Sequence, residues 1–195
     1  MPRPPMLRVI DWEEVLQSGQ DFDGWLELAE SDANHDAMLK TLSAITLEAD
    51  VVQGLAALKR RLNVVAIAED WCGDVLRHVP ALQAMAEASE QLHVRFITRE
   101  QYLDVFTRYL TNGGEAIPKF IFISDQFVEC GNWGPMPYAC RELIARGKAC
   151  GDVGAARKLV SAAYDADPGL KIVVRELYAL VQIASAEKER GLSSR

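Results

Sequence analysis

The chain has 195 residues, of which 49% are hydrophobic and 25% are charged, and its formal net charge is −7. This composition is typical of a globular protein and excludes a disordered chain. Nucleic acid and anionic membrane are excluded as partners, because both are bound through clustered Lys and Arg. No window approaches the roughly 20 apolar residues of a membrane span, and the first residues carry no secretion signal. We therefore expect a cytoplasmic protein.

The four cysteines, Cys72, Cys130, Cys140 and Cys150, form no Cys-x-x-Cys pair. They also form no cluster with histidine at the spacing of a metal site. We therefore predict that the chain holds no metal and no cofactor. In a reducing compartment, this pattern indicates three structural thiols and one thiol of functional interest.

The first 62 residues carry helical patterns. Asp11 and Glu14, three residues apart, form a capping pair at the start of a short helix that ends at Gly19. We expect an edge strand over residues 6–10 before this helix. Further helices are predicted over residues 22–30, 35–48 and 50–62, the last capped by Asp50. The Asn34-His35-Asp36 sequence indicates a capping turn, because three adjacent residues cannot converge on one ion without further ligands.

The central feature of the sequence is an apolar run of strand length, Val64–Ala68, followed by Glu69-Asp70-Trp71-Cys72-Gly73. A helical pattern begins directly afterwards, so Cys72 is predicted to lie at a strand-to-helix junction. A thiol at a helix N-terminus is close to the positive end of the backbone dipoles and to unpaired N–H groups. Both favour the thiolate, which makes Cys72 the candidate nucleophile.

The segment after Cys72 has a helical apolar pattern to about Ser89, with Val75 on its buried face or at the edge of that face. Pro80 removes one backbone hydrogen bond and is expected to bend this helix. His78 follows Cys72 by six residues, which places it about 240° around the helix. We therefore predict that His78 is solvated and does not act as a base for the thiol.

The second half of the chain continues with alternating strands and helices. Thr98 and Gln101 form a capping pair for a helix that carries an aromatic stripe, and at this spacing core packing is expected, not a ligand site. Strands are predicted over residues 92–97, 119–123 and 127–133, and helices over residues 98–109, 135–148, 152–167 and 170–187. No internal repeat and no linker divides the chain.

Three sequence features together resemble the thioredoxin superfamily: Trp71-Cys72-Gly73, Pro80 in the following helix, and Ile117-Pro118 ahead of a predicted hairpin. The resemblance covers roughly residues 50–145. It implies an α/β thioredoxin-like fold, a central mixed sheet with flanking helices, plus extra N- and C-terminal helices. We expect one compact domain, in which an N-terminal helical extension (1–49) and a C-terminal helical extension (149–195) pack on a thioredoxin-like core (50–148).

The resemblance also implies a site around Cys72. In the thioredoxin fold the matching proline is cis and faces the active cysteine, and the residue before it pairs with a bound peptide as an added strand. The loop that matches Trp133-Gly134 completes the substrate surface. The implied apolar patch consists of Trp71, Cys72, Ile117, Pro118, Trp133 and Gly134, with Gly73 and Asp74 beside the thiol. In thioredoxins a smaller residue usually occupies the position of Trp133, so this indole is expected to enlarge the patch or partly cover the thiol.

Three departures from the thioredoxin pattern bear on activity. Thioredoxins carry a second, resolving cysteine three residues after the first, and this chain has Val75 there. Asp74 stands where proline is usual, and together with Glu69 and Asp70 it is expected to disfavour the thiolate. The buried acid that moves the proton of the nucleophile in thioredoxins is matched by Ala66, so that help is absent.

Two hypotheses follow. The first is a single-cysteine thiol-disulfide oxidoreductase of cell redox homeostasis, in which Cys72 attacks a substrate disulfide and another thiol resolves the intermediate. That thiol could be a low-molecular-weight thiol such as glutathione, a protein thiol, or a distant cysteine of the chain such as Cys130. The alternative is a non-catalytic thioredoxin-fold module whose apolar patch binds a peptide or protein or forms a homodimer interface.

Overall fold

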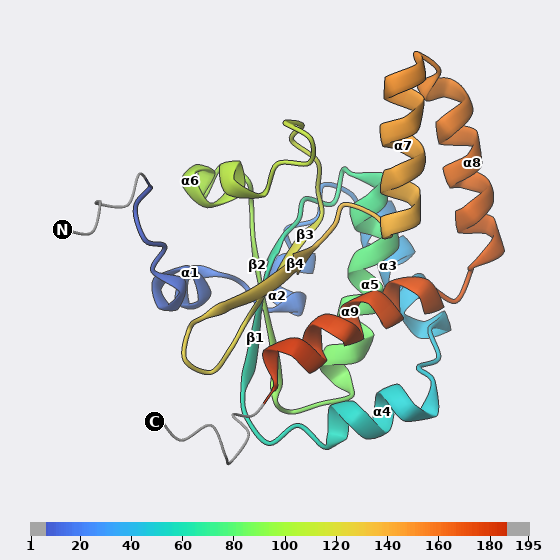
Figure 1. The fold of residues 1–195 in the computed structure, drawn as a ribbon. Helices are drawn as coiled ribbons and strands as arrows, with labels where there is room; N and C mark the ends of the chain where they lie inside the picture. Colours follow the sequence, from blue (N-terminus) through green and yellow to red (C-terminus); the bar gives the residue numbers. More distant parts are fainter. Residues whose placement is uncertain (1–6, 187–195) are drawn as a thin grey trace, which may run out of the picture.

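A computed structural model describes residues 7–186 of the chain (Figure 1). Its centre is a mixed four-stranded sheet in the order β2-β1-β3-β4. The strands are β1 (Leu62–Ile67), β2 (Leu92–Ile97), β3 (Lys119–Ile123) and β4 (Glu129–Trp133). Strand β1 runs parallel to β2 and antiparallel to β3, and β3 pairs with β4 as an antiparallel hairpin.

Helices surround this sheet (Figure 1). They are α1 (Trp12–Ser18), α2 (Phe22–Leu26), α3 (Asp32–Ala44), α4 (Ala49–Ala56), α5 (Gly73–Glu87), α6 (Leu103–Phe106), the 3-10 helix η1 (Thr107–Tyr109), α7 (Tyr138–Cys150), α8 (Val153–Ala166) and α9 (Lys171–Ala184). Helices α5 and α9 contact each other, α5 also packs on β2, and α9 packs on β3 and β4. Between residues 7 and 186, no helix combines the length and the apolar character needed to cross a membrane.

The two central strands explain why this arrangement is stable. All residues of β1 and β3 are buried, which agrees with their continuous apolar sequences. On one face of the sheet Phe120 stacks on Trp133, with ring centroids 5.4 Å apart. At the edge strand, Phe96 of β2 stacks at 4.7 Å on Trp25 of α2, so the N-terminal helices contribute to the same hydrophobic core.

Helices form in each N-terminal region where they were predicted, with different bounds, whereas the predicted strand does not form. The helix predicted over residues 50–62 is α4, which ends at Ala56, and Leu62 already belongs to β1. Asp11 caps α1 by accepting a hydrogen bond from the Glu14 N–H. The described part of the predicted edge strand, residues 7–10, is irregular, and Met6 lies outside the described residues. Helix α2 is shorter than predicted, and α3 begins earlier because Ser31 is its cap. Asp50 lies inside α4, and Glu48 occupies the cap position.

The later elements follow the predictions closely, with one shortened helix. Thr98 accepts a hydrogen bond from the Gln101 N–H, but this bond lies in a turn before the helix and does not cap it. The N-cap residue is Tyr102, and the helical segment is only α6 followed by η1. Gly151 ends α7 in the left-handed conformation (φ 79°), and Asp152 caps α8. Figure 1 shows α7 and α8 side by side at one end of the molecule, and Gly147 lies where a Cβ would be 2.5 Å from that of Ala156.

One carboxylate of helix α9 forms hydrogen bonds with two neighbouring elements, in addition to the packing of α9 on the sheet. Glu176 accepts a hydrogen bond from the Trp133 indole N–H at 2.6 Å and one from the Tyr138 backbone N–H at 3.0 Å. Trp133 ends β4, and Tyr138 is the first residue of α7. The carboxylate therefore joins three elements, and it satisfies an indole N–H that is shielded from water.

We expect Glu176→Ala to lower the free energy of unfolding by about 1–3 kcal/mol, because it leaves the indole N–H of a buried Trp133 without its acceptor. The matched control is Arg175→Ala, one residue earlier, whose ion pairs with Glu48 and Asp50 are exposed. Urea unfolding followed by tryptophan fluorescence measures both changes. Equal destabilisation by the two variants would contradict the role given to Glu176.

Candidate active site

Cys72 lies where the chain turns from the loop after β1 into α5, as its N-cap residue. Its half-buried thiol donates a hydrogen bond to the Ile117 carbonyl at 3.5 Å. The Ile117–Pro118 peptide bond is cis. The structure therefore brings together three residues that the sequence proposed as neighbours: Cys72, Ile117 and Pro118.

A second loop packs against the proline loop. Gly134 has φ +119°, and a Cβ at this position would lie 2.0 Å from the Pro118 carbonyl oxygen, so only glycine allows the two backbones to approach this closely. The ammonium of Lys119 donates to the Gly134 carbonyl at 2.9 Å and to the Thr111 hydroxyl. Burial and the nearby Arg141 lower the pKa of Lys119 to about 8.

Trp71 presents the exposed surface of the motif. Its side chain is 49% exposed, and the Arg99 guanidinium lies 5.0 Å from the ring centroid. Beside it lies a cavity of about 330 Å³, whose apolar lining includes Trp25 and Leu28 from the N-terminal segment. The exposed Gly73 adjoins Trp71 at the start of α5.

Trp133 does not extend this surface, contrary to the sequence-based expectation. Only 2% of the residue is exposed, because its ring packs between Phe120 and His78 and its N–H is bound to Glu176. Ile117, Pro118 and Gly134 are also buried. The exposed part of the predicted patch is therefore Trp71, with Gly73 and the half-buried thiol beside it.

Two of the three acids near the thiol are held by their own partners. Glu69 accepts from the Arg99 side chain at 3.0 Å and from the Arg99 backbone N–H. Asp70 is 7% exposed and accepts from the Glu30 N–H at 2.8 Å and the Asn34 amide at 2.9 Å. The predicted capping turn at Asn34-His35-Asp36 is wrong, because these residues lie inside α3 and Ser31 is its cap. The Asn34 side chain instead anchors the motif to α3.

Asp74 differs from Glu69, whose donor is a cation, and from Asp70, which has two neutral donors, because a single neutral phenol is its side-chain donor. The Tyr164 hydroxyl of α8 donates to the Asp74 carboxylate at 2.9 Å. Burial raises the pKa of Asp74, while the Tyr164 hydrogen bond and the Arg77 charge lower it. Asp74 is therefore the acid near Cys72 whose charge depends most on a single hydrogen bond.

His78 is buried, and the prediction of a solvated histidine is wrong. The side chain has no exposed surface and contacts both the Trp133 and the Tyr164 rings edge-on at 5.3 Å. Its Nε2 lies 3.2 Å from the Tyr164 hydroxyl. Burial and the Arg77 charge lower the pKa of His78 to about 3, so it is neutral at physiological pH.

The positions that differ from thioredoxins are filled by apolar core. Val75 and Ala66 are both 0% exposed. Val75 occupies the place of a resolving thiol, and Ala66 that of a buried acid, so neither function is available there. All four cysteines are free, and residues 7–186 contain no group of three or more His, Cys, Asp or Glu side chains suited to a metal ion.

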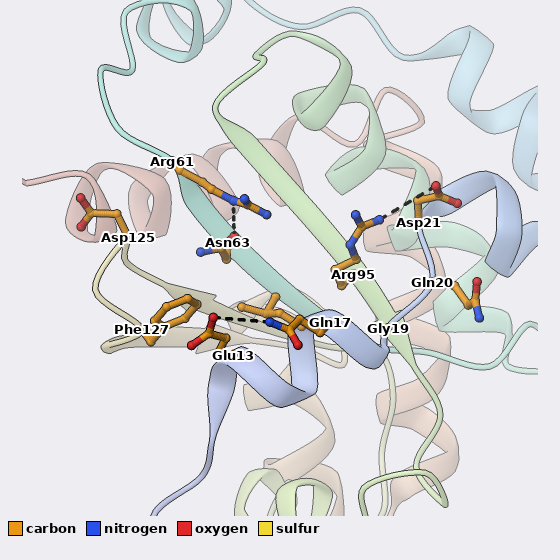
Figure 2. A pocket seen from close by; sticks show the side chains of 11 residues that line it. Glu13, Gln17, Gly19, Gln20, Asp21, Arg61, Asn63, Arg95, Asp125 and Phe127 are labelled. Carbon is orange, nitrogen blue, oxygen red and sulfur yellow. Dashed lines mark hydrogen bonds and ion pairs between the residues drawn. The ribbon is translucent and has the colours of Figure 1, made fainter.

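A separate cavity of about 400 Å³ lies at the other end of β1 from the Cys72 loop. Figure 2 shows that its polar side chains contact one another: Arg61 donates to Asn63, Gln17 donates to Glu13, and Arg95 lies 4.0 Å from Asp21. The lining contains no cysteine and carries both signs of charge. The candidate active site is therefore the Cys72 end of the sheet.

These features define a thioredoxin-like protein. A sequence model described as thioredoxin matches residues 19–152, and the chain belongs to this family. A search of curated proteins finds no match. Two solved structures share the fold. One is a protein of unknown function from Pseudomonas aeruginosa, with 18% identity, 89% of this chain and 98% of that chain covered, and a TM-score of 0.71. The other is an HIV epitope-scaffold protein, with 16% identity, the same coverage and a TM-score of 0.69.

The sequence did not indicate the contacts of three polar residues in this region: His78, Lys119 and Tyr164. Lys119 carried a signal, since a lysine that opens a fully apolar strand is unusual unless it is hydrogen-bonded. His78 was judged only by its angle from Cys72, which ignored that α9 and α8 cover that side of α5. Tyr164 lies in a helix outside the residues used for the resemblance, and nothing in the sequence connects it to Asp74.

We expect His78 to make folding stability depend on acid. Below the ordinary histidine pKa near 6.5, position 78 binds a proton in the unfolded chain but not in the folded chain. As the pH is lowered from about 6.5 to about 3, the free energy of unfolding therefore decreases by up to about 1.4 kcal/mol per pH unit. His78→Gln keeps a donor for Tyr164 and removes this proton. Urea unfolding at pH 7, 6, 5 and 4 is expected to show a shallower decline for the variant; parallel curves would contradict a buried neutral His78.

Proposed function

We propose that the protein is a single-cysteine thiol-disulfide oxidoreductase of cell redox homeostasis that acts through Cys72. The observation that carries this proposal is the thiol at the N-terminus of α5, hydrogen-bonded to the carbonyl that precedes the cis-proline. A helix N-terminus stabilises a thiolate through its dipole and its free N–H groups. The adjoining backbone of Ile117 suits an extended substrate segment bound as an added strand.

The reaction needs only thiols and a disulfide. The Cys72 thiolate attacks one sulfur of a substrate disulfide, forms a mixed disulfide and expels the second substrate sulfur as a thiolate, which takes up a proton. A second thiol, from a protein or from a low-molecular-weight thiol such as glutathione, loses its proton and attacks the substrate sulfur of the mixed disulfide. A new disulfide forms between the second thiol and the substrate sulfur, and Cys72 leaves as a thiolate.

The second thiol must come from outside the motif. Position 75 is a buried valine and has no sulfur. Cys130 lies on β4 and Cys150 ends α7, while Cys140 near the start of α7 is buried, and burial raises its pKa and disfavours its thiolate. We assign the resolving thiol to a partner. The exposed Trp71 provides apolar contact for the substrate. The cavity beside it combines the apolar Trp25 and Leu28 with acidic residues such as Glu30 and Glu100.

The burial of Val75 and Ala66 also favours a second candidate, a non-catalytic module that binds a peptide or protein through Trp71 and the Ile117 backbone. Both candidates use the same surface. They differ in whether binding depends on the sulfur of Cys72, and this difference decides the experiment.

We expect a peptide disulfide to form a mixed disulfide on Cys72 that added glutathione releases, detected by intact mass spectrometry. Cys72→Ser is expected to abolish the adduct, and the matched control Cys150→Ser, at an exposed cysteine, is expected to retain it. If the adduct forms equally well on Cys72→Ser, the proposal fails. If Cys72→Ser binds the reduced peptide as tightly as the parent and neither chain exchanges, the binding module is correct.

Restoring a cysteine at position 75 tests the missing resolving step. We expect Val75→Cys to shorten the lifetime of the mixed disulfide at least about tenfold without added thiol, because the new sulfur attacks within the same molecule. Val79→Cys is the matched control, since Val79 is equally buried but lies one turn further along α5. Unchanged lifetimes in Val75→Cys, measured by quenched-flow mass spectrometry, would contradict the assignment of position 75 to resolution.

A further inference from the structure

A chain of hydrogen bonds connects the first turn of α5 with α8. The Tyr164 hydroxyl has one proton, which it donates to the Asp74 carboxylate at 2.9 Å. His78 Nε2, 3.2 Å from the same hydroxyl oxygen, must then be the protonated nitrogen and donate to it. The other ring nitrogen, Nδ1, is buried and has no hydrogen-bond partner. Tyr164 thus has both of its hydrogen-bonding roles filled by α5.

The position of Tyr164 is itself fixed by α5. The Arg77 guanidinium lies 4.3 Å above the tyrosine ring and donates to the backbone carbonyls of Tyr164 at 2.5 Å and Asp167 at 3.3 Å. Tyr164 lies outside the residues 19–152 that match the family. The helix that supplies it is therefore a feature of this chain beyond the matched family region.

The titratable and charged groups around Asp74 come from four helices. They are Arg77 and His78 of α5, Cys140 of α7, Tyr164 of α8, and Glu176 of α9 beside Cys140. His78 is neutral, and burial together with the Asp74 charge raises the pKa of Tyr164, which keeps the phenol protonated. Arg77 and the Tyr164 hydroxyl are therefore the two groups that favour a charged Asp74.

Resting on the proposed function of Cys72, we propose that Tyr164 is a positioning residue that keeps the carboxylate of Asp74, two residues after Cys72, ionised and thereby restrains thiolate formation. Asp74 follows Cys72 by two residues in the first turn of α5, where a negative charge opposes the helix dipole. Without the hydrogen bond from Tyr164, a smaller fraction of Asp74 is ionised near its pKa. The C-terminal helix α8 thus controls how readily the nucleophile forms.

The test is the rate at which the uncharged reagent iodoacetamide alkylates Cys72, followed between pH 5.5 and 9 by mass spectrometry of the Cys72 peptide. Asp74→Asn is expected to raise the rate at pH 7 about three- to tenfold, because it removes a charge near the thiol. Tyr164→Phe removes only the hydroxyl and is expected to raise the rate about two- to threefold near pH 6 and less at pH 8, where Asp74 is ionised in either chain.

The double variant decides whether Tyr164 acts through Asp74. We expect Asp74→Asn/Tyr164→Phe to match Asp74→Asn at every pH, since the hydroxyl then has no carboxylate to stabilise. The control Tyr178→Phe removes a hydroxyl that faces Gly54 of α4 and is expected to leave the profile unchanged. The proposal is overturned if Tyr164→Phe changes the alkylation rate equally in the parent chain and in Asp74→Asn. It is also overturned if Asp74→Asn leaves the alkylation rate unchanged.

Alkylation and exchange are measured on the same variants, so the two proposals can fail separately. If no variant forms a mixed disulfide with a peptide disulfide, the oxidoreductase function fails, while the alkylation profiles still report on Tyr164 and Asp74. If exchange occurs but its rate and the alkylation profile ignore Tyr164→Phe, only the role of Tyr164 is overturned.

Discussion

The register of β1 against β3 is the constraint on which the candidate active site depends. Ile67 is paired with Lys119 at the end of the antiparallel ladder, so the chain that leaves β1 and the chain that enters β3 emerge side by side. Cys72 and Ile117 lie in these two segments, and the thiol reaches the Ile117 carbonyl. A slip of one residue would turn each side chain of β1 to the other face of the sheet and would shift Cys72 relative to Ile117. The burial of both strands thus stabilises the site as well as the fold.

Polar contacts then connect this site to the helices at both ends of the chain. Asp70 is held by Asn34 of α3, and Asp74 is held by Tyr164 of α8. A buried acid requires hydrogen-bond donors, because an unpaired carboxylate in a low-dielectric interior is costly. The two acids that flank the Trp-Cys-Gly motif therefore require the terminal helices to pack where they do. This explains why the additional helices and the core form one structure around the motif.

The fold followed from the sequence because its strongest patterns were local. The apolar runs of β1 and β3, the cysteine at the strand-to-helix junction and the cap at Asp11 each depend on neighbouring residues, and each is observed. The surroundings of Trp133 depended on contacts between distant elements, and neither the pattern of β4 nor its spacing indicates that Glu176 binds the indole. The place of a site residue in its strand, helix or loop was thus predictable from the sequence, whereas the hydrogen-bond partners of its side chain were not.

The same distinction applies to charge. From the sequence, Glu69, Asp70 and Asp74 were expected to act alike on the thiol, because all three are acids within three residues of Cys72. In the structure Glu69 is paired with the Arg99 cation, whose charge offsets its own. Asp70 and Asp74 both accept hydrogen bonds from neutral donors, and these do not cancel the charge of a carboxylate. The electrostatic character of the site is therefore set by the partner of each acid, and counting acids in the motif overestimates the repulsion that a thiolate at Cys72 would meet.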